Sequence, residues 1–208
     1  MRKKMLQGIY LITDVEGQDR YSHVELADAA YRAGIQMVQY RDKRRSDRKV
    51  LAEIREIMNL KSKGSQLLVV NDRPDLAKVG GADGVHLGQD DLPISEVKQF
   101  LGEEVIVGGT SASLEEARQV ERAGADYVAL GHIFESSTKE KQYAPRGLDT
   151  LRRVRQEVEV PLVAIGGITL KNAPQVIDAG ADIIAVSSAI CRAENPEQAA
   201  AELVESFQ

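Results

Sequence analysis

Three polar side chains that could bind an anion stand at alternate positions early in the chain: Gln39, Arg41 and Lys43. In an extended strand, side chains two residues apart point to the same face. We therefore expect the intervening Val38 and Tyr40 to pack against helices, and the polar trio to point toward the centre of the fold. Arginine can bind phosphate through two N–H donors, and lysine adds a point charge. The spacing predicts a phosphate-binding strand end; the alternative is the solvated start of a basic loop.

Two carboxylates follow two consecutive short apolar runs. Asp72 comes directly after the run 67–71, and Asp91 follows the run 84–87 by four residues. Each could simply cap the next helix. Magnesium takes hard oxygen ligands and keeps several waters, so two neighbouring carboxylates and diphosphate oxygens would suit it. Beside the cationic trio, we predict that Asp72 and Asp91 bind Mg²⁺.

Hydroxyl groups and glycines mark three more strand ends. Ser113 precedes a glutamate by three residues, the pattern of a capping box, so we assign Ser113 to the helix cap and Ser111 to a ligand. The Gly-Gly pair that ends at Gly167 and the serines Ser187 and Ser188 predict a second phosphate site, because glycine lets backbone N–H groups approach the oxygens. The long segment 131–147, rich in hydroxyls and lysines, is typical of a closing lid, or of an ordinary flexible loop.

Eight short β-branched runs must position these residues. They cover residues 8–13, 36–41, 67–71, 84–87, 105–109, 127–131, 161–166 and 183–187. Amphipathic stretches such as 24–33, 48–61, 114–123 and 172–179 alternate with them, and only the gap after the third run looks too short for a helix. The pattern predicts an α/β protein with one domain over residues 1–208, a (β/α)8 TIM barrel whose active site lies at the carboxyl ends of the strands. A doubly wound open sheet is the alternative.

A Gly-Ala-Asp triplet recurs before three of these runs, at residues 81–83, 124–126 and 180–182. The glycine can end the preceding helix in a left-handed conformation. The repeat therefore supports βα units and carries no chemistry of its own.

Composition excludes several classes of function. A net charge of −5 and the absence of tryptophan argue against a nucleic-acid partner. No apolar run approaches the roughly 20 residues that span a bilayer, and the basic start lacks a secretion signal, so we expect no membrane partner. The single cysteine, Cys191, permits no intrachain disulfide. We expect a cytoplasmic enzyme that acts on small phosphorylated molecules.

Taken together, these motifs resemble the thiamine phosphate synthase family along nearly the whole chain. The matching pieces are Gln39-Tyr40-Arg41-Asp42-Lys43, Asn71-Asp72-Arg73, the run 84–91, the run 134–139, Ile165-Gly166-Gly167-Ile168 and Ser187-Ser188-Ala189-Ile190. The resemblance implies a transferase that joins hydroxymethylpyrimidine diphosphate to thiazole phosphate and needs Mg²⁺.

By position, the resemblance also assigns roles to individual residues. The pyrimidine diphosphate would be held by Gln39, Arg41, Lys43, Asn71, Ser111 and Lys139, with Arg41, Lys43 and Lys139 stabilising the leaving group. The thiazole phosphate would be held by Ser136, Ser137, Thr138, Gly167, Ser187 and Ser188. Asp72 and Asp91 would bind the metal.

One residue departs from the family pattern. The family usually has proline where this chain has His132, whereas a related group of thiazole tautomerases carries Gly-His-x-Phe-Glu there and uses the histidine to move a proton. Those tautomerases tend to lack the cationic trio and the Asn-Asp pair that this chain retains. A tautomerase with His132 as base, and a phosphate-binding homologue without catalysis, remain the alternatives.

The other histidines have simpler expectations. His86 alternates with two glycines and should face the barrel interior, either as a packed core residue or in contact with a ligand. We expect His23 at the surface and Cys191 in the core.

Overall fold

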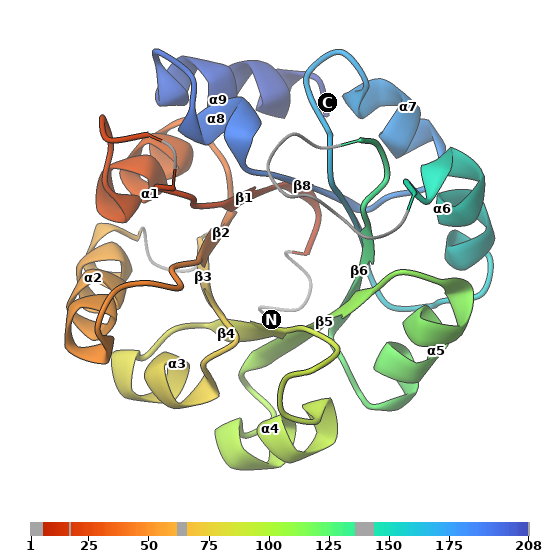
Figure 1. The fold of residues 1–208 in the computed structure, drawn as a ribbon, viewed down its shortest axis with the longest axis horizontal. Coiled ribbons are helices and arrows are strands. Elements are labelled where there is room, and N and C mark those ends of the chain that lie inside the picture. The colour runs from red at the N-terminus through yellow and green to blue at the C-terminus, as the bar shows by residue number, and fades with distance from the viewer. Residues whose placement is uncertain (1–5, 17, 62–65, 136–143, 208) are drawn as a thin grey trace.

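The protein is a closed (β/α)8 barrel in the computed structural model (Figure 1), which describes residues 6–16, 18–61, 66–135 and 144–207. Each strand pairs in parallel with the next, and β8 closes on β1. The strands are β1 Gly8–Ile12, β2 Met37–Tyr40, β3 Leu67–Asn71, β4 Gly84–Leu87, β5 Ile106–Ser111, β6 Tyr127–Gly131, β7 Leu162–Ile165 and β8 Ile183–Val186. The predicted barrel and all eight predicted strands are confirmed, and the doubly wound alternative is wrong.

Helices surround the strands on all sides (Figure 1). They are α1 His23–Arg32, α2 Asp47–Leu60, α3 Pro74–Gly80, α4 Ile94–Leu101, α5 Leu114–Arg122, α6 Gly147–Arg155, α7 Ala173–Asp178, α8 Ser188–Cys191 and α9 Pro196–Glu205. The gap after β3 does hold a helix, contrary to our expectation. Pro74 opens α3 near its first position, where the missing N–H costs nothing, and Gly81 ends it at φ 74°, so a short connection suffices.

Two apolar layers follow from the strand alternation. Val38, Tyr40 and their counterparts on the other strands pack outward under the helices. Tyr10, Met37, Val69, Ile106 and Tyr127 fill the barrel interior instead. The barrel is therefore a packed core whose free polar surface lies at its ends.

The aspartates of the Gly-Ala-Asp repeat have a structural function. Asp83 donates its backbone N–H to the Leu68 carbonyl, and its carboxylate accepts the Leu68 N–H at 2.7 Å. Asp126 and Asp182 make the same pair of bonds to Val107 and Leu162 on their preceding strands. Three cations bind these carboxylates in turn: Lys61 directly after α2, Lys98 in α4 and Arg155 in α6. The repeat thus fastens neighbouring strands at their amino ends.

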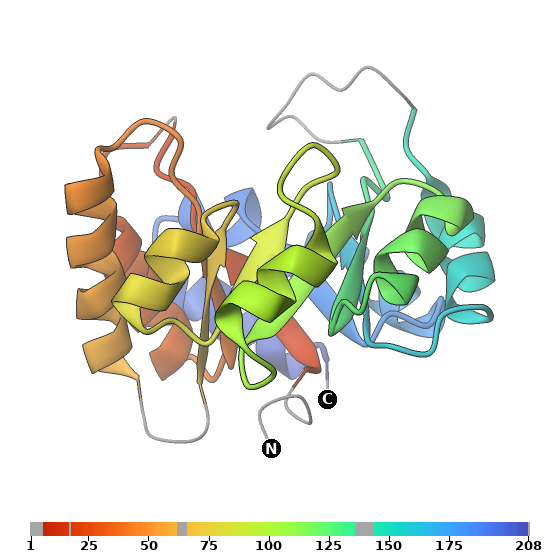
Figure 2. The ribbon, with the colours of Figure 1, turned by 90° about the horizontal axis from the view of Figure 1, so that it is seen from below.

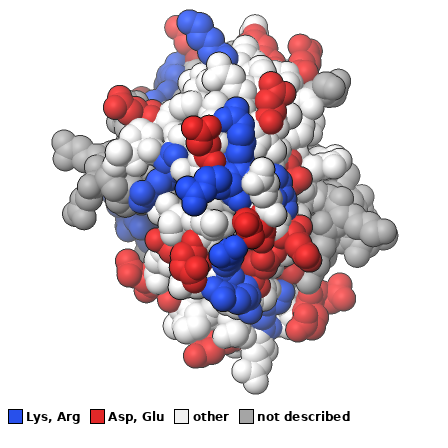
Figure 3. All heavy atoms as spheres, turned by 90° about the vertical axis from the view of Figure 1, so that its right-hand side faces the viewer, with Lys and Arg blue, Asp and Glu red and all other residues white. Residues whose placement is uncertain are grey.

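Acidic and basic side chains intermix over the helices on the side of β6 (Figure 3). Ion pairs such as Arg118–Glu157 at 2.7 Å and Arg122–Glu115 at 2.9 Å belong to this surface. Among the helices that the structure describes, none is long and apolar enough to cross a membrane.

Candidate functional site

The carboxyl ends of the strands and the loops that follow them form one face of the barrel, the upper face in Figure 2. On β2 the predicted alternation is confirmed, since Val38 and Tyr40 belong to the outer apolar layer. Gln39 points inward, is 2% exposed, and donates its amide to the Tyr10 hydroxyl at 2.7 Å. Beyond the strand end, Arg41 is partly buried and Lys43 is exposed.

Asp72 lies between a cation and a second carboxylate. Lys43 Nζ is 3.7 Å from Asp72 Oδ2, and the Asp91 carboxylate, from the loop after β4, lies near enough to Asp72 to raise its pKa. Burial, and after it the Asp91 carboxylate, hold the pKa of Asp72 above its usual range, while Lys43 and the Asn71 amide pull that pKa downward. The two carboxylates therefore lie close together at the rim, and Lys43 does not fully offset the effects that raise the pKa of Asp72.

The backbone conformations of the loops after β3 and β4 hold the two acids in place. Asp72 has a φ of 60°, which a non-glycine residue rarely adopts. Its backbone N–H nevertheless pairs with the His86 carbonyl at 2.9 Å, so the ladder between β3 and β4 continues past the last residue of β3. Asp91 turns back to accept the Gly88 N–H at 2.6 Å, and a Cβ on Gly88 would stand 3.0 Å from that same carboxylate oxygen. The glycine leaves the space in which Asp91 is held.

Two carboxylates at the rim are too few to surround a metal ion with protein ligands alone, but they suit a hard divalent cation that also binds substrate oxygens. Among the described residues, no group of three or more His, Cys, Asp or Glu side chains could hold a metal. Two carboxylates and substrate oxygens are the set that Mg²⁺ commonly uses, with water in the remaining positions.

The end of β5 places its two hydroxyls on opposite sides. Ser111 is fully buried and donates to the Ala129 carbonyl at 3.2 Å. Thr110 faces the interior, where its hydroxyl is 2.8 Å from His86 Nε2. Ser113 accepts the Glu116 N–H at 3.2 Å, so the predicted cap is confirmed, although the Glu116 carboxylate accepts from Ala112 instead of closing the box on Ser113. The ligand role expected of Ser111 stays a prediction, and Thr110 has the better position for it.

Sequence reasoning missed a chain of hydrogen bonds that crosses the barrel interior. Gln39 donates to Tyr10, the Tyr10 and Tyr127 hydroxyls are 3.1 Å apart, and His86 Nδ1 is 3.0 Å from the Tyr127 hydroxyl. Since Gln39 donates to the Tyr10 oxygen, we assign the Tyr10 proton to Tyr127 and the Tyr127 proton to His86 Nδ1, which gives each hydroxyl one donor and one acceptor role. His86 Nε2–H then donates to Thr110.

Burial lowers the pKa of His86 to about 4, so the imidazole is neutral, with one ring nitrogen donating and the other accepting. The expectation that His86 faces the interior is confirmed. Its two ring nitrogens are occupied by Tyr127 and Thr110, so His86 is a satisfied core residue that orients a hydroxyl at the rim.

Close packing requires glycine at both Gly166 and Gly167. A Cβ on Gly166 would stand 2.3 Å from the His132 Cβ, and one on Gly167 would stand 2.3 Å from the Glu135 carbonyl oxygen. Both glycines also have positive φ, 103° and 67°. The segment after β6 therefore crosses directly over β7, and Asn172 donates to the Gly167 carbonyl at 3.0 Å to hold the turn. The glycines are needed for the fold whether or not they approach a phosphate.

His132 lies inside this crossing and is 3% exposed. Ser187 and Ser188 follow β8, partly buried, and Ser188 begins α8. Cys191 is buried as expected, its thiol is 3.6 Å from the Ile12 carbonyl oxygen, and burial raises its pKa to about 11. The predicted residues Ser136, Ser137, Thr138 and Lys139 lie outside the described residues.

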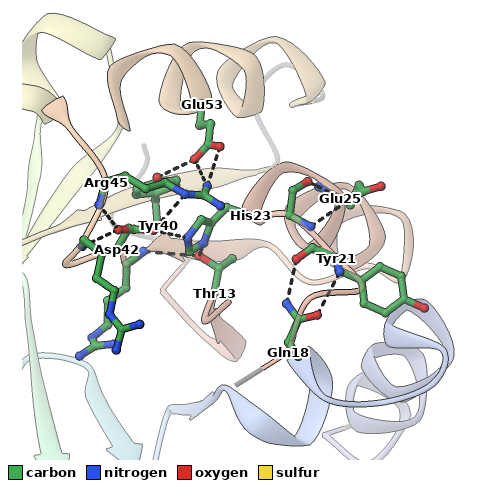
Figure 4. A network of polar contacts seen from close by, with 12 residues as sticks. Thr13, Gln18, Tyr21, His23, Glu25, Tyr40, Asp42, Arg45 and Glu53 are labelled. Atoms are coloured by element: carbon green, nitrogen blue, oxygen red, sulfur yellow. Dashed lines mark hydrogen bonds and ion pairs between the residues drawn. The ribbon is translucent and has the colours of Figure 1, made fainter. Parts of the chain in front are cut away.

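His23 is fully buried, which corrects our expectation of a surface residue. It is the first residue of α1, directly after the N-cap Ser22. Its two ring nitrogens contact Thr13 at the end of β1 and Asp42 in the loop after β2 (Figure 4). Asp42 folds back over the ring, and this covers a side chain that the helix alone would leave in water.

Comparisons with known proteins agree with this arrangement. The sequence profile described as thiamine monophosphate synthase matches residues 9–190. A thiamine-phosphate synthase of Chloroflexus aurantiacus is 43% identical over 94% of this chain and 90% of its own length. One from Natronomonas pharaonis is 42% identical over 97% of this chain and 95% of its own length.

Solved structures give the same result. A thiamine phosphate pyrophosphorylase from Pyrococcus furiosus has a TM-score of 0.88 with 34% identity, over 100% of this chain and 98% of the other. A geranylgeranylglyceryl phosphate synthase from Thermoplasma acidophilum, at TM-score 0.74 and 17% identity, shares the fold alone.

Proposed function

Since the chain belongs to the thiamine monophosphate synthase family, we propose that it is a transferase that joins hydroxymethylpyrimidine diphosphate to thiazole phosphate. The products are thiamine phosphate and inorganic diphosphate. The observation that carries the proposal is the meeting of Asp72 with Asp91 and Lys43 at one rim. A barrel that only bound a phosphate would need neither the paired acids nor the cation between two strand ends.

The rim of β2, β3 and β4 would bind the diphosphate. Arg41 and Lys43 supply positive charge, and the Asn71 amide stands beside Asp72. Asp72 and Asp91 would hold Mg²⁺, which neutralises charge on the diphosphate when bound. The raised pKa of Asp72 supports this fit, because two acids that share one place are stabilised by a cation. Lys139 belongs to the same proposed set.

The pyrimidine would lie over the barrel interior, beside Gln39 and Thr110. The interior hydrogen-bond chain fixes both side chains, with Gln39 held by Tyr10 and Thr110 held by His86. We assign to Thr110 the ligand contact that the sequence suggested for Ser111, since the Ser111 hydroxyl is already bound to Ala129. Fixed donors of this kind need no reorganisation during the reaction.

The rim of β7 and β8 would bind the thiazole phosphate through Gly167, Ser187 and Ser188. Ser136, Ser137 and Thr138 belong to this proposed site as well. A positive φ at Gly167 and the partly buried Ser187 support a close approach of an anion to the backbone.

The reaction breaks the bond between the pyrimidine methylene carbon and a diphosphate oxygen. It forms a bond from that carbon to the thiazole nitrogen, and the bonding electron pair of the old bond leaves with diphosphate. The protein's task is to stabilise the leaving anion with Arg41 and Lys43 and to hold the second ring in line. No side chain needs to act as a nucleophile.

We do not propose the tautomerase function. His132 is 3% exposed and its Cβ packs where a Cβ on Gly166 would stand, so its position supports a packing role. The curated relatives named above are thiamine-phosphate synthases. The single cysteine fits a cytoplasmic location, which is part of the same proposal.

The proposal is tested by removing the paired acids. Asp72→Ala and Asp91→Ala should each reduce the rate of thiamine phosphate formation by at least about 100-fold at saturating Mg²⁺, since the acids act on the leaving group. Far-ultraviolet circular dichroism should remain that of the native barrel. Full activity of the double variant in the presence of a chelator would refute the metal assignment.

A further inference from the structure

We propose that His23, Thr13 and Asp42 form an anchor that fixes the main chain carrying Arg41 and Lys43, so that His23 is a positioning residue for the binding of a diphosphate group. This inference rests on the proposed function, because it presumes that Arg41 and Lys43 bind the diphosphate. It adds a buried residue that acts through the loop carrying Arg41 and Lys43 and would not touch the diphosphate itself.

The anchor joins three segments that are distant in sequence (Figure 4). His23 Nδ1 is 2.7 Å from the Thr13 hydroxyl, and His23 Nε2 is 3.1 Å from Asp42 Oδ2. The Arg41 backbone N–H donates to the same Thr13 hydroxyl at 3.4 Å. The end of β1, the start of α1 and the loop after β2 are therefore tied at one buried point.

Asp42 continues the anchor on the far side of Lys43. One Asp42 oxygen accepts the backbone N–H groups of Arg44 and Arg45, each at 2.7 Å. The other oxygen receives His23 Nε2. The loop that carries Arg41 and Lys43 is thus held on both sides of Lys43, by Thr13 before it and by Asp42 after it.

The protons can be assigned from the partners. Asp42 accepts only, so His23 Nε2 carries a proton and donates to it, and the neutral ring leaves His23 Nδ1 as an acceptor. The single proton of the Thr13 hydroxyl then has two acceptors within reach, His23 Nδ1 at 2.7 Å and the Gln39 carbonyl at 3.1 Å. The Thr13 oxygen in turn accepts the Arg41 N–H. A hydrocarbon at position 23 would leave the Asp42 carboxylate without one donor, and the Thr13 hydroxyl would keep only the longer bond to the Gln39 carbonyl.

Tyr40, Glu53 and Arg45 cover the anchor and keep the His23 ring away from water. The Tyr40 ring packs 4.5 Å from the His23 ring, centroid to centroid, and its hydroxyl donates to Glu53 at 2.6 Å. Arg45 binds the same Glu53 carboxylate at 2.5 and 2.6 Å and lies 3.4 Å from Asp42. Burial is the main cause that lowers the pKa of His23, against the opposing effect of Asp42, so the ring stays neutral at physiological pH.

The two cations depend on this support because little else restrains them. The Lys43 side chain is 55% exposed and its ion pair with Asp72 is 3.7 Å long. The Arg41 guanidinium forms no hydrogen bond to another described residue. Long side chains of this kind are aimed mainly by the main chain that carries them, and a displacement of about 1 Å in a positioning group can cost up to about 100-fold in rate.

The experiment compares variants of position 23 in steady-state kinetics. His23→Leu should raise the KM for the pyrimidine diphosphate, and the inhibition constant of inorganic diphosphate, by about 10-fold, as loss of an orienting partner typically does. The KM for thiazole phosphate should stay within about twofold of the native value, because Gly167, Ser187 and Ser188 follow β7 and β8, and β1 separates those strands from the loop after β2 that the anchor holds. Thr13→Val should have the same selective effect. His23→Gln, whose amide can still donate to Asp42, should recover most of the affinity.

A matched control separates positioning from stability. Tyr31→Phe removes a buried hydrogen bond from the opposite end of the same helix, where the Tyr31 hydroxyl donates to the Leu67 carbonyl. It should lower the melting temperature without a selective change in the KM for the diphosphate. If His23→Leu behaves like Tyr31→Phe, or leaves both KM values unchanged, the inference is wrong.

Arg41→Ala distinguishes this failure from failure of the proposed function. If Arg41→Ala weakens inorganic diphosphate and His23→Leu does not, only the positioning role of His23 is overturned. If Arg41→Ala leaves diphosphate binding unchanged, the diphosphate site itself has been placed wrongly and the anchor has no such role.

Discussion

Tyr127→Phe should destabilise the barrel more than the loss of one hydroxyl normally does. The Tyr127 hydroxyl is fully buried and stands between the Tyr10 hydroxyl at 3.1 Å and His86 Nδ1 at 3.0 Å. Its removal leaves Tyr10 without an acceptor and His86 without a donor, while Gln39 and Thr110 still occupy the outer ends of the chain. The Tyr127 ring is tightly packed, since a Cβ on Gly108 would stand only 1.9 Å from it, so a phenylalanine ring should keep the same place.

The magnitude follows from the two orphaned groups. A buried polar group that loses its partner costs roughly 1–3 kcal/mol, so the free energy of unfolding should fall by about 3 kcal/mol. For a chain of this size, that corresponds to a fall in Tm of roughly 6–12 °C. Tyr21→Phe is the matched control, because the Tyr21 hydroxyl donates to the Glu194 carbonyl in an exposed contact. It should change the free energy by less than about 0.5 kcal/mol.

Urea unfolding, followed by circular dichroism and checked by calorimetry, measures both variants. The reasoning also requires a functional loss in Tyr127→Phe, because Thr110 is oriented through His86. If the two variants lose the same small amount of stability, the buried hydrogen-bond chain contributes little and its account is refuted.

Four further expectations concern the rim and the anchor. Thr110→Val should lower kcat/KM by about 10-fold or more, whereas Ser111→Ala should change it by less than about threefold in the same assay, because only Thr110 faces the interior. Lys43→Met should raise the KM for the pyrimidine diphosphate and weaken its dependence on salt; an unchanged KM would contradict the assignment. Ser188→Asp should weaken thiazole phosphate far more than diphosphate, and equal weakening would count against two separate sites. The pKa values of His23 and His86 are both lowered on folding, so the unfolded chain binds these protons more readily and stability should be lost as pH falls below about 6.5, with a contribution of at most about 1.4 kcal/mol per pH unit from each histidine. His23→Gln should remove only the His23 contribution and so make the slope shallower in urea titrations at pH 5 to 7.5.

The sequence predicted side-chain orientation best on β2, where apolar and polar residues alternate strictly. On β2 the alternation predicted Val38 and Tyr40 toward the helices and Gln39 toward the interior, and these orientations are confirmed, whereas the role of Arg41 beyond the strand end stays a prediction. The acids Asp72 and Asp91 were brought together correctly because consecutive parallel strands end at the same face.

The hydroxyls of β5 show why other predictions were less certain. The strand was expected to end at residue 109, so the faces of Thr110 and Ser111 could not be derived from its alternation. It continues through Ser111, and the inward series is Ile106, Gly108 and Thr110. Which of the two hydroxyls can reach a ligand depends on the face of the strand it is on, and that face became known only because β5 extends two residues further than expected.

The sequence could not predict the burial of residues whose contacts come from distant parts of the chain. His23 follows a well-formed capping box at Ser22, which by itself describes an exposed helix start. Its environment comes from Asp42 and Tyr40, which reach it only after β2 has paired with β1. The aspartates of the repeat are similar, since Lys98 meets Asp126 across 28 residues.

The central claim is that this barrel joins two phosphorylated molecules with loss of diphosphate, and product analysis tests it most directly. Purified protein should be incubated with hydroxymethylpyrimidine diphosphate, thiazole phosphate and Mg²⁺, and the products measured by liquid chromatography and mass spectrometry. We expect thiamine phosphate and inorganic diphosphate in equal amounts, with formation of both stopped by a chelator. Absence of thiamine phosphate under all metal conditions, together with isomerisation of a thiazole carboxylate phosphate that is lost in His132→Ala, would contradict the claim.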